Sequence, residues 1–427
     1  MPKPYTVIVG KTVRHISRLR GGGSALPGLV VEKIDPSFVA RTLSNLPYGV
    51  VVVSGTNGKT TTTKIVVELL ESQGLKVFTN KTGSNFVRGV AAALLAEVNL
   101  RGKLSADIAV LELDEAHAVL FAKTVQPRYS LFLNVLRDQL DRFGEIDKTA
   151  QLLHTVAKYT SSDVIVNYDD PRLNSDKFLD GLTAEVSSFG ASDDLLDLFP
   201  SDDDLHTQTS RTKATSIAPE PVARLEAVEK NHATITMGDD QHIVELSLSG
   251  LYNTLNAVAA VALCRVVLGE KLNHGNLFRK LADVEPAFGR GEKLTIDGQP
   301  CELVLVKNPS GFRLGLQSFD PAEHATMIAI NDNYADGRDM SWLWDVDFSS
   351  LRSGGVAEVS GVRAYDMALR LHYDDVETPN IHEDIRLAIK HFLANSSGQP
   401  KRIFCTYTAM LAIRKILAKH TKMERVL

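Results

Sequence analysis

Short apolar runs alternate with segments of helical periodicity from residue 50 onward. The helical segments, 59–73, 86–97 and 147–159, carry apolar residues at three- and four-residue spacing. The runs beside them are rich in β-branched residues, as buried parallel strands are: Val50–Val53, Val77–Thr79, Ile108–Leu113, Ser130–Leu133 and Val164–Val166. This alternation predicts an α/β domain with a doubly wound sheet.

A second alternating block begins near residue 300 and predicts a smaller, Rossmann-like domain. Its strand-like runs are Leu303–Val306, Met327–Ile330, Ala357–Ser360 and Ile403–Thr406, with helical spacing over 383–395 and 407–418. Between the two blocks, Ala233–Met237 and Ile243–Leu248 predict a hairpin, and a helix is expected over about 254–268. We therefore expect an N-terminal segment at 1–48 that packs on a central domain at 49–292, and a C-terminal domain at 293–427.

Composition and charge narrow the functional classes. The net charge of −5 over 427 residues argues against nucleic acid as the main partner. No run of about 18 apolar residues is present, so no membrane-spanning helix is expected. The first 25 residues are basic and indicate either contact with an anionic surface or substrate, or a solvated helix. An acidic, Ser/Thr-rich stretch at about 191–216 indicates an exposed insertion. Cys264, Cys301 and Cys405 are too far apart for a zinc motif and suit a reduced cytoplasm.

A glycine-rich turn follows the Val50–Val53 run and precedes the first helical segment. Such a turn presents backbone N–H groups to phosphate at the positive end of a helix. The general phosphate loop has a further glycine where Val53 stands, so the match is to a shorter variant; the alternative is a chance glycine-rich turn. We expect Lys59 to reach the β- and γ-phosphates of a nucleoside triphosphate and Thr60 to bind Mg²⁺. The predicted nucleotide-binding residues here are Gly55, Thr56, Asn57, Gly58, Lys59, Thr60 and Thr61.

Polar residues at the ends of later strands add candidates, because ligands bind at the carboxyl ends of parallel strands. Glu112 is a candidate Mg²⁺ ligand, directly or through water, with Asp114 and Glu115 as weaker ones; a helix-initiating acid is the alternative. The loop 134–144 offers Asp138 for metal or water, and Arg137 or Arg142 for phosphate charge. Asn167-Tyr168-Asp169-Asp170-Pro171 closes the next strand in the same way, although loops are normally polar.

These motifs, together with Asn253-x-x-Asn256 and Gly289-Arg290-Gly291-Glu292, resemble those of Mur ligases in kind and order. The resemblance implies an ATP- and Mg²⁺-dependent enzyme that phosphorylates a carboxylate and lets an amine displace the phosphate. It also implies that Asn253 or Asn256 lies near the adenine and Arg290 near the phosphates. Helix capping is the alternative for the two asparagines.

Departures from the usual Mur ligase pattern point to one branch of the family. About 49 residues precede the first strand, fewer than a nucleotide-sugar-binding domain needs, and no histidine follows Asp138 to hold a second metal. Lys307–Gly311 and the stretch Asn331–Asp345 resemble the MurT family, the ligase-like subunits of lipid II isoglutaminyl synthases. A four-cysteine zinc ribbon common in that family is replaced here by the acidic stretch, so no zinc is expected.

The MurT resemblance implies amidation of the D-glutamate α-carboxylate in the lipid II stem peptide, which gives D-isoglutamine in peptidoglycan biosynthesis. None of the three cysteines has a nucleophile-elbow sequence around it, so ammonia is expected from a separate glutaminase, GatD in this family. By resemblance, Asp339 completes the partner's Cys-His pair; a turn or a salt bridge with Arg338 is the alternative.

Tyr334, Trp342 and Trp344 are candidate interface anchors, and core packing is the alternative for the two tryptophans. We expect a cytoplasmic protein that acts at the inner face of the membrane. The contact with the membrane is made either by the basic N-terminus or through lipid II itself. The rival readings are an ordinary Mur- or folylpolyglutamate-type amino-acid ligase and a noncatalytic nucleotide-dependent scaffold.

Overall fold

The computed structural model describes residues 4–19, 26–80, 86–136, 146–199, 217–229, 231–248, 250–285, 290–418 and 421. The chain divides into two compact units. The larger unit comprises Met1–Val135, Asp147–Leu248 and Tyr252–Val284; the smaller comprises Leu136–Ile146, Ser249–Leu251 and Glu285–Leu427. The domain limits predicted from the sequence stay predictions, and the acidic stretch lies outside the described residues from 200 to 216.

A nine-stranded sheet in the order β2-β3-β1-β4-β5-β6-β7-β8-β9 forms the centre of the larger unit. The strands from β2 to β7 are parallel, and β7, β8 and β9 pair antiparallel. The bounds are β1 Val50–Ser54, β2 Val77–Thr79, β3 Ile108–Glu112, β4 Tyr129–Phe132, β5 Asp163–Asn167, β6 Glu185–Ala191, β7 Ala223–Glu229, β8 His232–Met237 and β9 Asp240–Glu245. The strand β1 is buried along its whole length, which its all-valine sequence favours.

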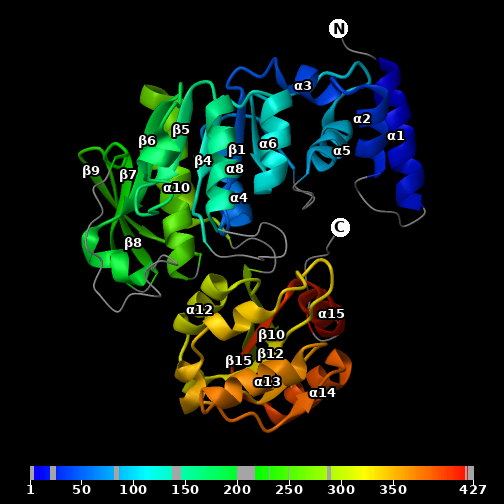
Figure 1. The fold of residues 1–427 in the computed structure, drawn as a ribbon, viewed down its shortest axis with the longest axis vertical. Helices are drawn as coiled ribbons and strands as arrows, with labels where there is room; N and C mark the ends of the chain where they lie inside the picture. Colours follow the sequence, from blue (N-terminus) through cyan, green and yellow to red (C-terminus); the bar gives the residue numbers. More distant parts are fainter. Residues whose placement is uncertain are drawn as a thin grey trace. The chain divides into compact units, whose positions relative to one another are not determined.

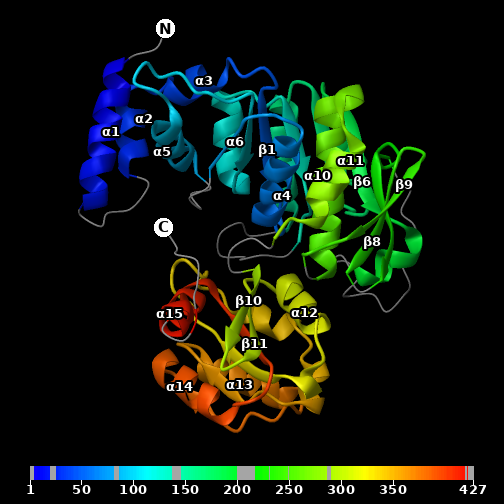
Figure 2. The same ribbon diagram turned by 180° about the vertical axis from the view of Figure 1, so that it is seen from behind.

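Helices cover both faces of this sheet. Figure 1 shows α6 and α8 in front of it, and Figure 2 shows α4, α10 and α11 on the other side. For α4, α6 and α8 this division follows from right-handed crossovers, because the chain moves along the sheet in one direction through α4 and in the other through α6 and α8. The bounds are α4 Lys59–Ser72, α5 Val87–Glu97, α6 Glu115–Thr124, α8 Ile146–Tyr159, α9 Asp176–Leu179, α10 Leu251–Leu268 and α11 His274–Ala282, with 3-10 turns η1 Asp193–Leu198 and η2 Gly269–Lys271.

One described helical segment, Leu251–Lys271, has the length and apolar composition of a membrane span. Of its apolar window, 72% is buried inside the protein. This burial is what the core helix of an α/β domain requires, so the segment is weak evidence for a membrane span.

Three helices precede the first strand: α1 Pro4–Leu19, α2 Leu26–Ile34 and α3 Phe38–Leu43. The helices α1 and α2 pack on each other, and all three contact α5. The approach of α2 to α5 is close, because a Cβ at Gly28 would lie 1.9 Å from the carbonyl oxygen of Arg88. The Lys11 ammonium donates to the carbonyl of Val98 at 2.6 Å, which ties α1 to the end of α5. The N-terminal segment therefore contacts the body of the larger unit.

The smaller unit has a six-stranded sheet in the order β10-β11-β15-β12-β13-β14. Only the β10–β11 pair is antiparallel in this described sheet. Its strands are β10 Arg290–Ile296, β11 Gln299–Leu305, β12 Ala325–Ala329, β13 Glu358–Ser360, β14 Ile381–His382 and β15 Lys401–Cys405. Its helices are α12 Pro309–Gln317, α13 Ala364–Tyr373, α14 Ile385–Asn395 and α15 Tyr407–Leu417, with 3-10 turns η3 Pro321–Glu323, η4 Ser341–Asp345 and η5 Ser349–Ser353.

Each face of the smaller sheet has its own apolar core. On one face, α12, α13 and η4 contribute Phe312, Met367 and Trp342. On the other, α14 and α15 contribute Phe392 and Ile413. The predicted doubly wound and Rossmann-like arrangements are thus both confirmed. The predicted hairpin forms as well, but its second strand is Asp240–Glu245 rather than Ile243–Leu248, because the turn is shorter than expected and pairs Met237 with Asp240.

Candidate functional site

The glycine-rich turn connects β1 directly to α4 and needs glycine at two positions. Gly55 has φ +131° and Gly58 has φ +85°, conformations that L side chains rarely adopt. A Cβ at Gly58 would also lie 2.3 Å from the side-chain oxygen of Asn256. Gly58 is the N-cap of α4, so the loop places its backbone N–H groups at the positive end of that helix. This is the local structure of a phosphate-binding loop.

Asn134, at the end of β4, holds this loop from the neighbouring strand. Its side-chain oxygen accepts from Asn57 N at 2.8 Å, and its amide donates to the Asn57 carbonyl at 3.1 Å. Its own carbonyl accepts from Thr56 N at 3.0 Å. Asn134 thus fixes the loop, a role that sequence analysis did not assign to it because it depends on the pairing of β1 with β4.

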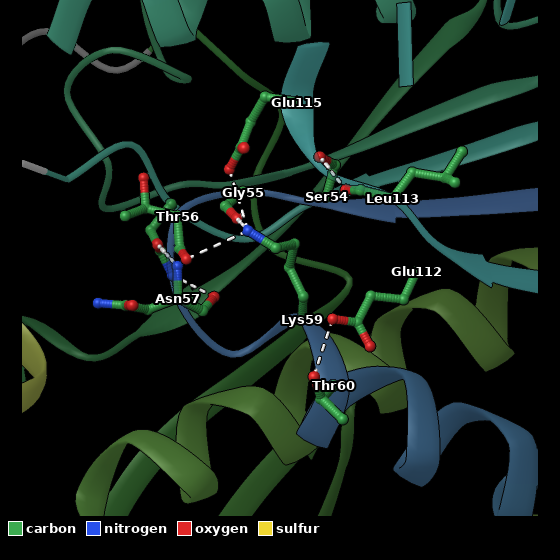
Figure 3. A network of polar contacts seen from close by, with 10 residues as sticks. Ser54, Gly55, Thr56, Asn57, Lys59, Thr60, Glu112, Leu113 and Glu115 are labelled. Atoms are coloured by element: carbon green, nitrogen blue, oxygen red, sulfur yellow. Dashed lines mark hydrogen bonds and ion pairs between the residues drawn. The ribbon is translucent and has the colours of Figure 1, made fainter. Parts of the chain in front are cut away.

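The Lys59 side chain is buried and points back into the loop, as Figure 3 shows. Its ammonium donates to the carbonyl of Gly55, to that of Thr56 at 3.3 Å, and to Glu115 Oε1 at 3.1 Å. A buried charge requires such partners, and Glu115 supplies the opposite charge. Glu115, a weaker candidate in the sequence, therefore faces the nucleotide loop.

Thr60 and Glu112 form a second pair beside Lys59 (Figure 3). The Thr60 hydroxyl donates to Glu112 Oε1 at 2.8 Å. Asn80 clamps the backbone of Glu112: its amide donates to the Glu112 carbonyl at 2.7 Å, and its oxygen accepts from Glu112 N at 3.0 Å. A hydroxyl beside a carboxylate is a hard-oxygen donor set, which fits Mg²⁺. The role of Asn80 was not predicted from the sequence. Its position directly after a strand was the one feature that could have indicated it.

The polar residues that close β5 bind other strand ends. Asn167 donates to the Leu133 carbonyl at 3.0 Å, and Asp169 Oδ2 accepts from Ala191 N at 2.7 Å. Asp170 accepts from Val135 N at 2.6 Å, and its burial raises the pKa of that carboxyl above its ordinary value. These contacts join β4, β5 and β6, so the residues act as structural links between strands.

The remaining predicted nucleotide contacts are described only in part. Asn256 lies against Gly58, and its amide is 3.4 Å from Asn253 Oδ1 at the start of α10. Arg290 begins β10 in the smaller unit. Arg137, Asp138 and Arg142 lie outside the described residues.

Asp339 lies in the loop between β12 and η4 of the smaller unit. Its Oδ1 accepts from Ser341 N at 2.9 Å, a turn contact. The same loop is anchored by buried Asp336, which accepts from Thr408 N at 2.7 Å at the start of α15. An anchored loop of this kind can present Asp339 in a fixed position.

The three aromatic candidates near Asp339 divide into core and surface. Trp342 is buried in the same apolar core as α12, so it is a core residue rather than an interface anchor. Tyr334 is 92% exposed and Trp344 is 50% exposed. These two are therefore available as surface anchors.

The cysteines offer no activated nucleophile. All three are buried. Burial raises the pKa of Cys301 to about 12 and raises the pKa values of the Cys264 and Cys405 thiols further. Because the thiolate is the reactive form, none of them is suited to attack an amide.

Comparison with known proteins identifies the family. The Mur ligase middle domain model matches residues 53–264, and the MurT ligase C-terminal model matches 305–410. The chain is 30% identical to the lipid II isoglutaminyl synthase (glutamine-hydrolyzing) subunit MurT of Streptococcus pneumoniae over 96% of both chains. It is 29% identical to the Staphylococcus aureus (strain N315) subunit of the same name, over 89% of this chain and 90% of that one. Among solved structures, Thermotoga maritima MurF ligase in complex with ADP has the same fold, with a TM-score of 0.67 and 18% identity over 91% of this chain and 84% of that one. The chain therefore belongs to the MurT family of Mur-ligase-like proteins.

Proposed function

We propose that this chain is the ATP-dependent synthetase subunit of a lipid II isoglutaminyl synthase, a carbon–nitrogen ligase of peptidoglycan synthesis. The observation that carries the proposal is the similarity to the Streptococcus pneumoniae subunit, which runs through 96% of both chains. The arrangement around Lys59 supports it, because a phosphate loop with Thr60 and Glu112 beside it is what an ATP-dependent ligase requires.

The proposed reaction activates the α-carboxylate of D-glutamate in the lipid II stem peptide. A carboxylate oxygen takes the γ-phosphoryl group of ATP, which gives an acyl phosphate and ADP. Ammonia then forms the C–N bond, and phosphate leaves with the electron pair of the C–O bond while nitrogen loses a proton. The phosphate is a far better leaving group than the oxygen of a free carboxylate.

Different side chains of the larger unit have different roles in the proposed phosphoryl transfer. The loop N–H groups and Lys59 would hold the phosphates and offset their charge. Thr60 and Glu112 would hold Mg²⁺, which supplies further charge neutralisation when bound. Asn134 and Asn80 keep the loop and Glu112 in position through backbone contacts.

The ammonia source is proposed to be a separate glutaminase subunit, GatD. The buried, high-pKa thiols of this chain support that division of labour. Asp339 is proposed to complete the partner's catalytic Cys-His pair, with Tyr334 and Trp344 as exposed anchors nearby in the sequence.

We further propose that the protein is cytoplasmic and works at the inner face of the membrane, where lipid II is anchored. The outward side of α1 supports surface contact. Tyr5, Ile8 and Ile16 are 52%, 54% and 44% exposed, whereas Val7 and Gly10 are buried. The helix contains no acidic residue, which suits an anionic lipid surface.

The deciding experiment is mass spectrometry of lipid II after incubation with the purified chain, GatD partner, ATP, Mg²⁺ and glutamine. Replacement of one OH by NH₂, with release of ADP and phosphate, is the expected result. Lys59→Ala should lower the rate at least about 100-fold with glutamine or ammonia, because phosphate charge is no longer offset. Thermal unfolding of this variant checks that it is folded, since Glu115 loses its partner.

Other products would identify the rival readings. Addition of an amino acid, with no amide formed from ammonia, would identify an ordinary Mur- or folylpolyglutamate-type ligase. ATP binding without turnover in the presence of partner and substrate would identify a scaffold.

A further inference from the structure

Three side chains of the smaller unit converge between its sheet and α14. Glu358 begins β13, His382 ends β14, and His391 lies on α14. Glu358 Oε1 is 2.6 Å from His382 Nδ1, and Oε2 is 2.8 Å from His391 Nδ1. One potential ligand atom from each residue lies within 4.8 Å of the other two. The cluster is made by three separate elements and plays no part in the reaction proposed above.

The carboxylate of Glu358 is completely buried, which makes its charge costly without a compensating cation. No lysine or arginine is among its hydrogen-bond or ion-pair partners in the described chain; these are the two imidazoles. Both histidines remain partly exposed, at 29% and 36% of their side chains. The site therefore combines a buried anion with a path from solvent.

We propose that Glu358, His382 and His391 bind a divalent transition-metal ion, zinc, that ties β13, β14 and α14 together. Two imidazoles and one carboxylate are a ligand set that zinc uses, with a further position left for water. Bond lengths near 2.0–2.1 Å in a tetrahedron separate ligand atoms by about 3.3 Å, so the contacts of 2.6 and 2.8 Å need to open by about 0.5 to 0.7 Å. The two imidazoles are partly exposed, so each has solvent rather than protein on one side.

Two neighbouring polar groups fit the same interpretation. Asn395, one turn after His391 on α14, has its amide nitrogen 2.9 Å from His391 Nε2. With the amide turned by 180°, its oxygen accepts from Nε2–H, which leaves Nδ1 unprotonated for the metal. Ser360 pairs with His382 in the sheet, and its hydroxyl is buried without a hydrogen-bond partner among the described residues. It adds a polar atom to the face that carries Glu358.

A zinc ion bound here would differ from the zinc-free chain expected from the sequence, where only cysteine ligands were considered. The described chain has a second His/carboxylate cluster, formed by Asp240, His242 and His274, and its environment differs from that of the Glu358 cluster. There the carboxylate is 65% exposed, and its ion pair with His274 is 3.5 Å long. Water already solvates that carboxylate, so nothing there requires a cation.

The test is zinc binding by the full-length chain after chelator treatment, measured in competition with a chromophoric zinc indicator. We expect one tight zinc ion per chain and a higher melting temperature with zinc than with magnesium. Glu358→Gln and His391→Ala should each abolish this tight site. Asn395→Leu should weaken it by roughly 10- to 100-fold, because it removes a partner of a ligand rather than a ligand.

The matched control is His274→Ala, which disrupts the second cluster and should leave the tight site intact. The proposal is overturned if the wild-type chain binds no zinc under these conditions. It is equally overturned if His391→Ala keeps the tight site, or if His274→Ala loses it. The amount of zinc bound per chain does not depend on amidation activity. The zinc measurement can therefore be interpreted even if the chain does not amidate lipid II.

Discussion

At the scale of single residues, Asp339 is the clearest test of the proposed partnership. Its contact to Ser341 N engages one carboxylate oxygen in a local turn. If the carboxylate also orients a partner's histidine, Asp339→Asn should lower glutamine-driven amidation by at least about 100-fold, since the amide no longer stabilises the imidazolium. Amidation driven by added ammonium should stay within about twofold of wild type, because the phosphate loop is untouched. Initial rates with each nitrogen source measure the difference.

The comparison of the two nitrogen sources also excludes a folding defect. Equal loss with glutamine and ammonium would place Asp339 in the ligase site and contradict the proposal. Asp336→Asn serves as a structural control, because Asp336 anchors the loop to α15. Its loss should lower the melting temperature, which Asp339→Asn should not.

At the scale of elements, the sequence predicted the central parallel strands because most of them are short, mainly apolar runs rich in β-branched residues, as Val50–Ser54 is. It missed β6, whose buried half is preceded by the polar stretch at Glu185, and β14, which is two residues long. The phosphate loop was predictable because its chemistry is local. The roles of Asn80, Glu115 and Asn134 were not, because each depends on which strands lie side by side.

The link between α2 and α3 gives a stability prediction. Arg41 donates to Asp35 at 2.5 Å, and this hydrogen bond is the main cause that lowers the pKa of Asp35 to about 2. The folded-state pKa lies below the unfolded one, so the stabilisation is present above about pH 4 and is lost as the pH falls toward 2. Asp35→Asn should cost about 2 kcal/mol at pH 7 and lower the melting temperature by several degrees.

Thermal unfolding at pH 7 and at pH 3 measures this effect. The difference between variant and wild type should shrink at the lower pH, because pH 3 lies below the ordinary pKa that Asp35 has in the unfolded chain, which then takes up a proton on unfolding. A constant difference at both values would show that packing, rather than the charge of Asp35, is responsible.

At the scale of the whole molecule, the outward side of α1 allows a test of the proposed contact with the membrane. Tyr5, Ile8 and Ile16 leave apolar area uncovered on a helix without acidic residues. Burying such side chains among lipid headgroups is favourable, and the net positive charge of a helix without acidic residues adds long-range attraction to anionic lipid. We expect the full-length chain with its partner to sediment with phosphatidylglycerol vesicles and much less with phosphatidylcholine vesicles.

Negative charge placed on this side of α1 should weaken the binding to vesicles. The double variant Ile8→Glu with Ile16→Glu loses apolar area and adds repulsion from the anionic surface, so its vesicle affinity should fall at least about tenfold. Ile243→Glu is the matched control, since Ile243 is 73% exposed on β9 and far from α1 in the sequence. Amidation of a soluble lipid II analogue should be the same in all three proteins. If the double variant and the control bind vesicles equally, contact through α1 is wrong.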